Sequence, residues 1–451
     1  MSEEVEDPEN LGQEEETPQN GSFQKRLFGL ISIGYNSSQL ILLNFLQYFA
    51  AQVGVTKTVM GFITGIRNLA SSLLQERVGR LSDKRGRKIP LLIGFFLAFA
   101  ITTVLIFSHN WIMLIIVVTI QAFSLSIIIP VWNAALGDVT VVKGRTSFIG
   151  RLSSIGQFVG VFMLLVLAGL FFIFDRYDGS VFLGMNITTL DWKIQYGIVF
   201  GVVAINFLIC AIGTIFLKET RKNDKVIDQP RMVEALKNKP FRNFIIINFF
   251  FGISMAALWP IYPIIQVNIV GMEFYSLTIV ATVYAIFFSF GSFIGGKLGD
   301  KFGRKPVMLI SRAIMFSVSL LYIPAILTGS WYYVILTNAV SGLGNGVFYV
   351  MMNTYALDLS DEKTMGSYSG LSQVTWGIAT FIAALLTGVV ADAIENRAII
   401  VLSLSEIDAA KRMAIILVIT IAVMRVVATI GYFFIKESLP KEMRDKNNSE
   451  A

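Results

Sequence analysis

The sequence predicts an all-α integral membrane protein with twelve transmembrane helices in two six-helix bundles related by internal duplication. Three observations lead to this fold. The 451 residues are 54% hydrophobic and 15% charged with a mean hydropathy of +0.66, which is too apolar for a soluble enzyme. Apolar segments close to the roughly 20 residues of a membrane-spanning helix fill nearly all of the chain outside its ends. A short glycine-rich, basic stretch occurs once in each half.

The expected spans follow the apolar segments in chain order. The first half contains 27–51, 58–79, 90–107, 111–133, 147–174 and 192–217. The second half contains 243–267, 277–298, 306–327, 331–355, 367–390 and 413–435. Pro260 and Pro263 are expected to disturb the seventh helix, because proline lacks the N–H that helix bonding needs.

The repeated stretch reads GRLSDKRGRK at 79–88 and GKLGDKFGRK at 296–305. Each copy joins two apolar segments, the second to the third and the eighth to the ninth. In a membrane protein, glycines allow helices to approach closely, aspartate caps a helix start, and Arg and Lys stay in the cytoplasm. The duplication continues further, because NAALGD at 133–138 matches NTYALD at 353–358, and FLKET at 216–220 matches FIKES at 434–438.

Positive charge predicts the orientation, since Lys and Arg near helix ends remain cytoplasmic. Both copies of the stretch, the 218–242 linker and the chain ends lie on one side of an even number of spans. We therefore expect a multi-pass protein of the cell membrane with both termini in the cytoplasm. The expected domains are a disordered acidic tail (1–22), an N-terminal bundle (23–217), the linker with a small interfacial helix at 232–236, a C-terminal bundle (243–436) and a tail (437–451).

Composition also argues against several function classes. The net charge of +6 follows from the cytoplasmic loops, so it does not indicate a nucleic-acid partner. Cys210 is the single cysteine and His109 the single histidine, which predicts no metal site, no cofactor and no enzyme. His109 is either an ordinary residue at the membrane interface or part of a proton relay. Asn186 begins a glycosylation pattern on the expected outer side.

The repeated stretch fits Gly-x-x-x-Asp-Arg/Lys-x-Gly-Arg-Arg/Lys, and the chain thereby resembles the major facilitator superfamily of secondary transporters. The resemblance implies alternating access around a central cavity lined by the first, fourth, seventh and tenth helices. It implies gating by Gly79, Asp83, Gly86, Arg87, Gly296, Asp300, Gly303 and Arg304, together with Asp138 and Asp358.

In this interpretation the two aspartates of the stretch contact helix starts in the opposite half, Asp83 at 367–370 and Asp300 at 147–150. Arg87 is expected to pair with Asp138, and Arg304 with Asp358. The alternative is a purely topological role for the basic cluster.

Polar stripes on the expected cavity helices are the candidate substrate site. In the second segment, Thr64, Arg67, Asn68, Ser71 and Gln75 share one face, and Arg67 lies about 18 Å from Gly79 at 1.5 Å per residue. Arg67 either contacts substrate or is held by groups between helices. The full candidate set is Asn36, Gln39, Gln47, Arg67, Gln121, Trp259, Tyr262, Gln266, Asn345 and Tyr349. For any one of them, an interhelical hydrogen bond is the alternative.

Two more arginines lie within apolar segments. Arg425 is expected to have a structural or snorkelling role, and Arg312 to reach the cytoplasmic interface.

Drug/proton antiporters and sugar porters each carry signatures that this chain lacks. No Asp or Glu falls in the middle of an expected span, which favours facilitated diffusion or exchange over proton symport. We expect a monomer in the bilayer that moves a small organic solute, anionic or amphipathic. The alternative is a transporter-like receptor or a lipid-moving protein without soluble-solute flux.

Overall fold

The computed structural model describes residues 18–108, 110–139, 145–176, 181–182, 185–186, 191–220, 232–360 and 365–439. The expectations for the acidic tail before Pro18, for His109, for 221–231 of the linker and for 440–451 lie outside the described residues. Within the described elements, the side chains of 18–22, 75–76, 79–80, 83–85, 137, 145–151, 153–154, 175, 181–182, 185–186, 232–233 and 365–367 also lie outside them, so the expectation for Gly79 is among those outside the description.

The first half consists of six long helices in the order expected. They are α1 Pro18–Gln52, α2 Lys57–Arg85, α3 Lys88–Ile106, α4 Trp111–Asp138, α5 Arg145–Arg176 and α6 Trp192–Ile215. Two short antiparallel strands, β1 Val181–Phe182 and β2 Met185–Asn186, lie between α5 and α6. Helix starts coincide with capping side chains such as Thr56, which accepts a hydrogen bond from the Val59 N–H, and Asp191, which accepts one from the Lys193 N–H.

The second half repeats this order with one interruption. Its elements are η1 Met232–Lys237, α7 Lys239–Ala256, α8 Ile261–Ile264, η2 Ile265–Ile269, α9 Phe274–Phe302, α10 Arg304–Thr328, α11 Tyr332–Asp358, α12 Met365–Leu402, α13 Glu406–Ile430 and η3 Gly431–Phe434. The seventh span is broken after Ala256, where the chain turns into α8 and then the π-helix η2. This break confirms the disturbance expected from Pro260 and Pro263.

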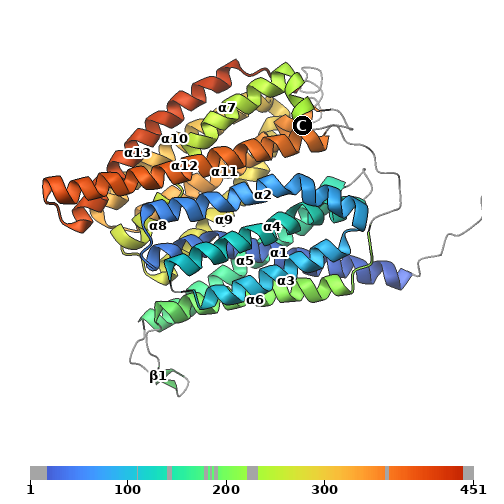
Figure 1. Cartoon of the computed structure of the whole chain (residues 1–451), viewed down its shortest axis with the longest axis horizontal. Coiled ribbons are helices and arrows are strands. Elements are labelled where there is room, and N and C mark those ends of the chain that lie inside the picture. The colour runs from blue at the N-terminus through green and yellow to red at the C-terminus, as the bar shows by residue number, and fades with distance from the viewer. Residues whose placement is uncertain are drawn as a thin grey trace, which may run out of the picture.

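Ten spans in the described part of the chain are long and apolar enough to cross a membrane. The other two long helices, α1 with 35 residues and α2 with 29, also have sufficient length but carry more polar residues. Apart from the two short strands between α5 and α6, the protein is therefore a helical membrane protein of two six-helix halves. We call the end that carries Gly86 and Gly303 the motif end, and the opposite end, where α2 begins, the far end. By the colour scale, α1 starts and α13 finishes at the motif end (Figure 1).

The two halves meet along α2 and α12, which lie side by side, and along α5 and α9 (Figure 1). Glycines allow the close approach of α2 and α12. A Cβ atom at Gly61 would clash with the Ala384 carbonyl oxygen, and one at Gly388 would clash with that of Lys57. Since these two contacts lie toward the far end, the halves are in tight contact there.

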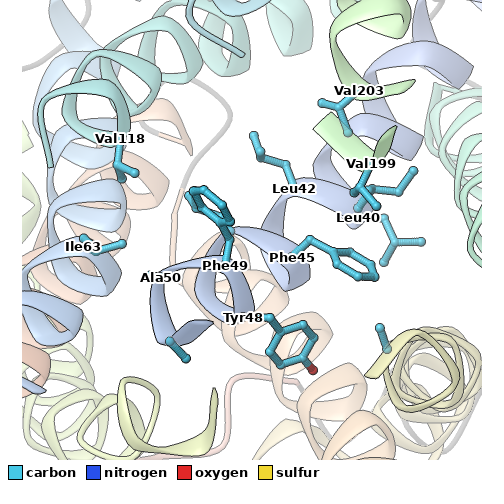
Figure 2. Close-up of a cluster of buried hydrophobic side chains, with 14 of the residues drawn as sticks. Leu40, Leu42, Phe45, Tyr48, Phe49, Ala50, Ile63, Val118, Val199 and Val203 are labelled. Carbon is cyan, nitrogen blue, oxygen red and sulfur yellow. The ribbon is translucent and has the colours of Figure 1, made fainter. Parts of the chain in front are cut away.

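Aromatic side chains fill the interior between the halves near the far end. Figure 2 shows Phe45, Tyr48 and Phe49 projecting from α1, with Val199 and Val203 of α6 nearby. Phe274, the first residue of α9, inserts between rings of the first half. Its ring centroid lies 5.1 Å from that of Phe45, 4.5 Å from that of Phe171 and 4.6 Å from that of Tyr196.

The predicted end of the eleventh span was wrong, because α12 continues from Val390 to Leu402. The polar residues Asp392, Glu395 and Arg397 resembled an exposed loop in the sequence. In the folded protein Asp392 and Glu395 contact the start of α2, which gives their charges partners without breaking the helix.

Candidate functional site

A cavity of about 330 Å³ lies between the halves and is lined by both of them. Six of the ten candidate substrate residues line it: Gln47, Arg67, Trp259, Tyr262, Gln266 and Asn345. This volume is at the lower end of the roughly 300–1,000 Å³ of ligand sites in proteins. Asn44 and Tyr48 of α1, Tyr284 of α9 and Tyr322 of α10 also line the cavity, although the sequence analysis did not select them.

The other four candidates do not line this cavity. Asn36 donates to the Ser32 carbonyl oxygen of its own helix at 2.8 Å. Gln39 accepts from Arg67 and does not line the cavity, and Gln121 is buried without lining it. Tyr349 is 54% exposed, with its ring 6.0 Å from that of Phe288. Helical spacing identified polar positions, but packing decided which of them reach the cavity.

Arg67 is held by a neighbouring helix and also lines the cavity. Its Nη2 donates to Gln39 Oε1 at 3.0 Å, so one edge of the guanidinium is held by α1. The same side chain lines the cavity together with Thr64 and Asn68, its neighbours on the polar face of α2. A guanidinium has five N–H donors, so the single bond to Gln39 leaves most of its donor capacity unpaired among the described residues.

Arg425 is structural but does not snorkel. It is only 1% exposed, and its guanidinium donates to the carbonyl oxygens of Ser254, Met255 and Met315 at 3.3, 3.1 and 2.7 Å. Further bonds go to Ser319 Oγ at 2.8 Å and to Tyr262 Oη at 3.4 Å. These bonds use all five donors, so Arg425 adds positive charge to the cavity wall without a free N–H.

Tyr262 and Tyr322 form the aromatic wall of the second half. Their rings stack with centroids 4.5 Å apart and an interplanar angle of 16°. The Tyr322 hydroxyl accepts from Gln266 Nε2 at 2.8 Å and from Asn338 Nδ2 at 3.4 Å. Tyr322 lies one helical turn from Ser319 on α10, but a tyrosine within an apolar segment has no sequence pattern that identifies it as a cavity residue.

The expectation for Arg312 was wrong, because its side chain is fully buried rather than at an interface. The guanidinium carbon lies 4.2, 4.0 and 4.5 Å from the ring centroids of Phe251, Phe348 and Tyr432. Its Nη2 also donates to Tyr432 Oη at 3.1 Å. Cation–π contacts and hydrogen bonds from three elements stabilise this charge, so it does not need to reach water.

At the motif end, both predicted ion pairs are present, one in each half. Arg87 Nε lies 3.0 Å from Asp138 Oδ2, and Arg304 Nε lies 3.0 Å from Asp358 Oδ2. Arg304 also pairs with Asp300 at 2.6 Å through Nη1. The expected contact of Asp83 with the opposite half, and the side chains of 147–150 proposed to meet Asp300, lie outside the described side chains.

Two glutamates that the sequence analysis noted only as part of the duplication complete these clusters. Glu219 accepts from the N–H groups of Arg87 and Lys88 at 2.8 and 3.2 Å, which caps the start of α3. Glu437 does the same for α10, where the Arg304 and Lys305 N–H groups lie at 2.8 and 3.0 Å. A carboxylate at a helix N-terminus is favoured by the helix dipole.

Gly86 and Gly303 sit beside these carboxylates with φ of 91° and 97°, a conformation that favours glycine. By contrast, Gly296 does not support a close helix approach, because an added Cβ would meet no atom within 4 Å. Its neighbours Gly295 and Gly299 make the approach instead, against Val347 and Met351 of α11.

At the far end, α12 caps α2 across the boundary between the halves. Asp392 accepts from the Lys57 N–H at 3.0 Å, the Thr58 N–H at 2.9 Å and the Thr58 hydroxyl at 2.7 Å. Lys57 also forms an ion pair with Glu395. Sequence reasoning missed this cluster, because its members are more than 330 positions apart. Together with the Phe274 contacts, it closes the far end.

Within the described residues, no three His, Cys, Asp or Glu side chains come together as a metal site.

A family model described as Major Facilitator Superfamily matches residues 27–247 and again residues 244–448. The chain is 23% identical over 392 residues to an uncharacterised MFS-type transporter of Methanocaldococcus jannaschii, which covers 84% of this chain and 91% of that protein. It is 22% identical over 379 residues to the multidrug transporter protein MdtP of Bacillus subtilis, covering 74% and 69% of the two chains.

Solved structures with a similar fold include a bacterial homologue of the human lysosomal transporter Spinster in an inward-facing, unoccupied conformation. It has a TM-score of 0.71 and 18% identity, and covers 94% of this chain and 98% of its own. The nucleoside transporter NupG has a TM-score of 0.65 and 14% identity, with 92% and 99% covered. At these identities the likeness shows a shared fold.

Proposed function

The chain belongs to the major facilitator superfamily and is a membrane transporter of that type, and we propose that it carries a small organic solute by alternating access. The observation that carries this proposal is the position of the cavity. It is lined by α1 and α2 of the first half and by residues of α7, α8, η2, α9, α10, α11 and α13 of the second, and contacts between the halves close its far end.

In this proposal the closed far end is the outer side of the membrane and the motif end is cytoplasmic, with both termini on that side. The basic residues of the two repeated stretches favour this orientation. The state described here then opens toward the cytoplasm. Movement of the halves would break the far-end contacts of Asp392 and close the motif end.

The repeated stretch is the proposed cytoplasmic gate. In each half an arginine, an aspartate and a glutamate connect three helix ends, as Arg304, Asp358 and Glu437 do in the second. We expect such a unit to move as one rigid body. The gate would then close when Asp83 or Asp300 reaches a helix start in the other half. The solute is expected to be anionic or amphipathic, because the cavity wall contains two arginines among aromatic rings.

The test uses the purified protein in liposomes that contain a mixture of small metabolites, with the luminal content followed by mass spectrometry. Specific solutes should cross the membrane of these liposomes faster than they cross the membrane of protein-free liposomes. Asp83→Asn should lower the initial rate at least several-fold at an unchanged melting temperature, whereas Glu406→Gln, at the exposed start of α13, should not.

A wild-type rate in the Asp83→Asn protein would refute the gating role. If no solute moved but fluorescent lipids crossed between leaflets, the solute-transport proposal would be replaced by lipid movement.

A further inference from the structure

From the groups that the protein leaves unpaired in its central cavity, we propose that the substrate is an aromatic carboxylate whose ring carries a hydroxyl or amino group. This inference rests on the proposed transport function and names its substrate class. It assigns the carboxylate to Arg67, the ring to the stacked Tyr262 and Tyr322, and the ring substituent to Gln266.

The charge of the cavity wall selects an anion. Arg67 of α2 and Arg425 of α13 both line the cavity, and none of the described lining residues is Asp or Glu. Arginine remains protonated in proteins, so the wall carries unbalanced positive charge within the membrane. An anionic ligand lowers that electrostatic cost, whereas a cation raises it.

The shape of Arg67 selects a carboxylate. Its donors form a planar fork that matches the two oxygens of a carboxylate. Among the described residues only Gln39 engages it, through Nη2 at 3.0 Å, and this bond orients the guanidinium without using its remaining N–H groups. Arg425 has no donor left, so the direct contact falls to Arg67.

The opposite wall selects a flat ring. Tyr262 and Tyr322 are stacked at 4.5 Å, and Trp259, three positions before Tyr262, also lines the cavity. Aromatic faces pack a planar ring better than a sugar or an inorganic anion, and offset or edge contacts contribute about 0.5–1.5 kcal/mol beyond burial. Leu40, Met255 and Val318 add apolar surface, which suits the body of an organic acid.

Gln266 selects the substituent. The side chain is 2% exposed and lines the cavity, and its Nε2 is committed to Tyr322 Oη at 2.8 Å. Its Oε1 is buried and has no hydrogen-bond partner among the described residues. A buried acceptor without a donor is costly, so a ligand O–H or N–H that reaches this oxygen removes a penalty already present.

The experiment measures binding to the purified full-length protein by titration calorimetry with four probes. 4-Hydroxybenzoate has all three features. 4-Hydroxybenzamide lacks the charge, 4-methoxybenzoate lacks the donor, and 4-hydroxycyclohexanecarboxylate lacks the aromatic ring. The expected order is 4-hydroxybenzoate tightest, with Kd about 10- to 100-fold weaker without the charge and about 3- to 10-fold weaker without the donor.

Variants connect each feature to its residue. Arg67→Gln should remove the preference for the carboxylate over the amide, and Gln266→Met should remove the preference for hydroxyl over methoxy. Arg397→Gln, which changes an exposed arginine on α12, should leave all four affinities unchanged. The comparison of probes on the unaltered protein does not depend on whether a variant folds.

The inference is overturned if the amide binds as tightly as the carboxylate, or if 4-hydroxybenzoate does not bind at millimolar concentration. Flux in liposomes separates this from the proposed function. Binding in the expected order without flux would contradict transport and leave the ligand class intact. Flux of neutral solutes without binding of aromatic acids would support transport and contradict the proposed ligand class.

Discussion

The cross-half contact of Asp392 makes the sharpest prediction. In Asp392→Ala the start of α2 loses three hydrogen bonds to a carboxylate, at 3.0, 2.9 and 2.7 Å. Bonds to charged groups contribute about 1.5–3 kcal/mol each when fully buried, and this site is only partly buried. We therefore assign about 1 kcal/mol to each bond.

In the proposed alternating-access cycle the bonds exist only while the far end is closed, so their loss disfavours that state alone. Three bonds correspond to about 3 kcal/mol, which changes the ratio of closed to open molecules by about 100-fold. Asp392→Asn keeps an acceptor oxygen but no charge, and should have an intermediate effect.

The assay is a distance measurement by pulsed electron paramagnetic resonance. Spin labels at Gln52→Cys and Glu406→Cys, exposed residues at the far ends of opposite halves, are introduced with Cys210→Ala as background. Asp392→Ala should produce a new population at longer distance. The control is Asp408→Ala, because within the described part of the chain its carboxylate accepts a hydrogen bond only from the Ser405 hydroxyl of its own half.

A distance distribution identical to that of the parent protein would refute the reasoning, since it would mean that Asp392 does not hold the far end closed. An equal change in the Asp408→Ala control would also refute it, because the effect would then come from any loss of negative charge.

Three further predictions concern stability and packing. Arg425→Met should lower the free energy of unfolding by about 3 kcal/mol or more, seen as a lower melting temperature in detergent, because three buried carbonyl oxygens lose their donor. Glu219→Gln and Glu437→Gln should each cost about 1 kcal/mol in chemical unfolding, and the double variant should show the sum, since the caps lie in separate halves. Gly61→Val should raise labelling of the cavity through the far end, because the new side chain clashes with the Ala384 carbonyl and separates α2 from α12 there; unchanged labelling would contradict the role of this close contact.

Features that depend on local sequence were predicted well. The helix order, the break near Pro260 and the Arg87–Asp138 and Arg304–Asp358 pairs all follow from hydrophobic segments, proline chemistry and a duplicated motif. In each case the partners belong to one helix or to neighbouring helix ends of one half. The duplication also identified Glu219 and Glu437, although not their capping role.

The candidate site was predicted only in part, because a helical stripe defines a face but not what the face meets. Gln47 and Gln121 are similar amides on expected cavity helices, yet Gln47 lines the cavity and Gln121 is buried away from it. Tyr322 was overlooked because a tyrosine in an apolar segment has no distinguishing pattern until its ring stacks on Tyr262.

The sequence by itself determined the membrane class, the two related halves and the family, since apolar length, repeated motifs and basic loops are properties of the chain that do not depend on packing. Only the tertiary structure decided the environment of each charged side chain. Arg67, Arg312 and Arg425 all lie in membrane-spanning helices, but one faces the cavity, one is enclosed by aromatic rings and one is saturated by carbonyls. The physical reason is that a buried charge is stabilised by groups from distant helices, and their positions are set by how the helices pack.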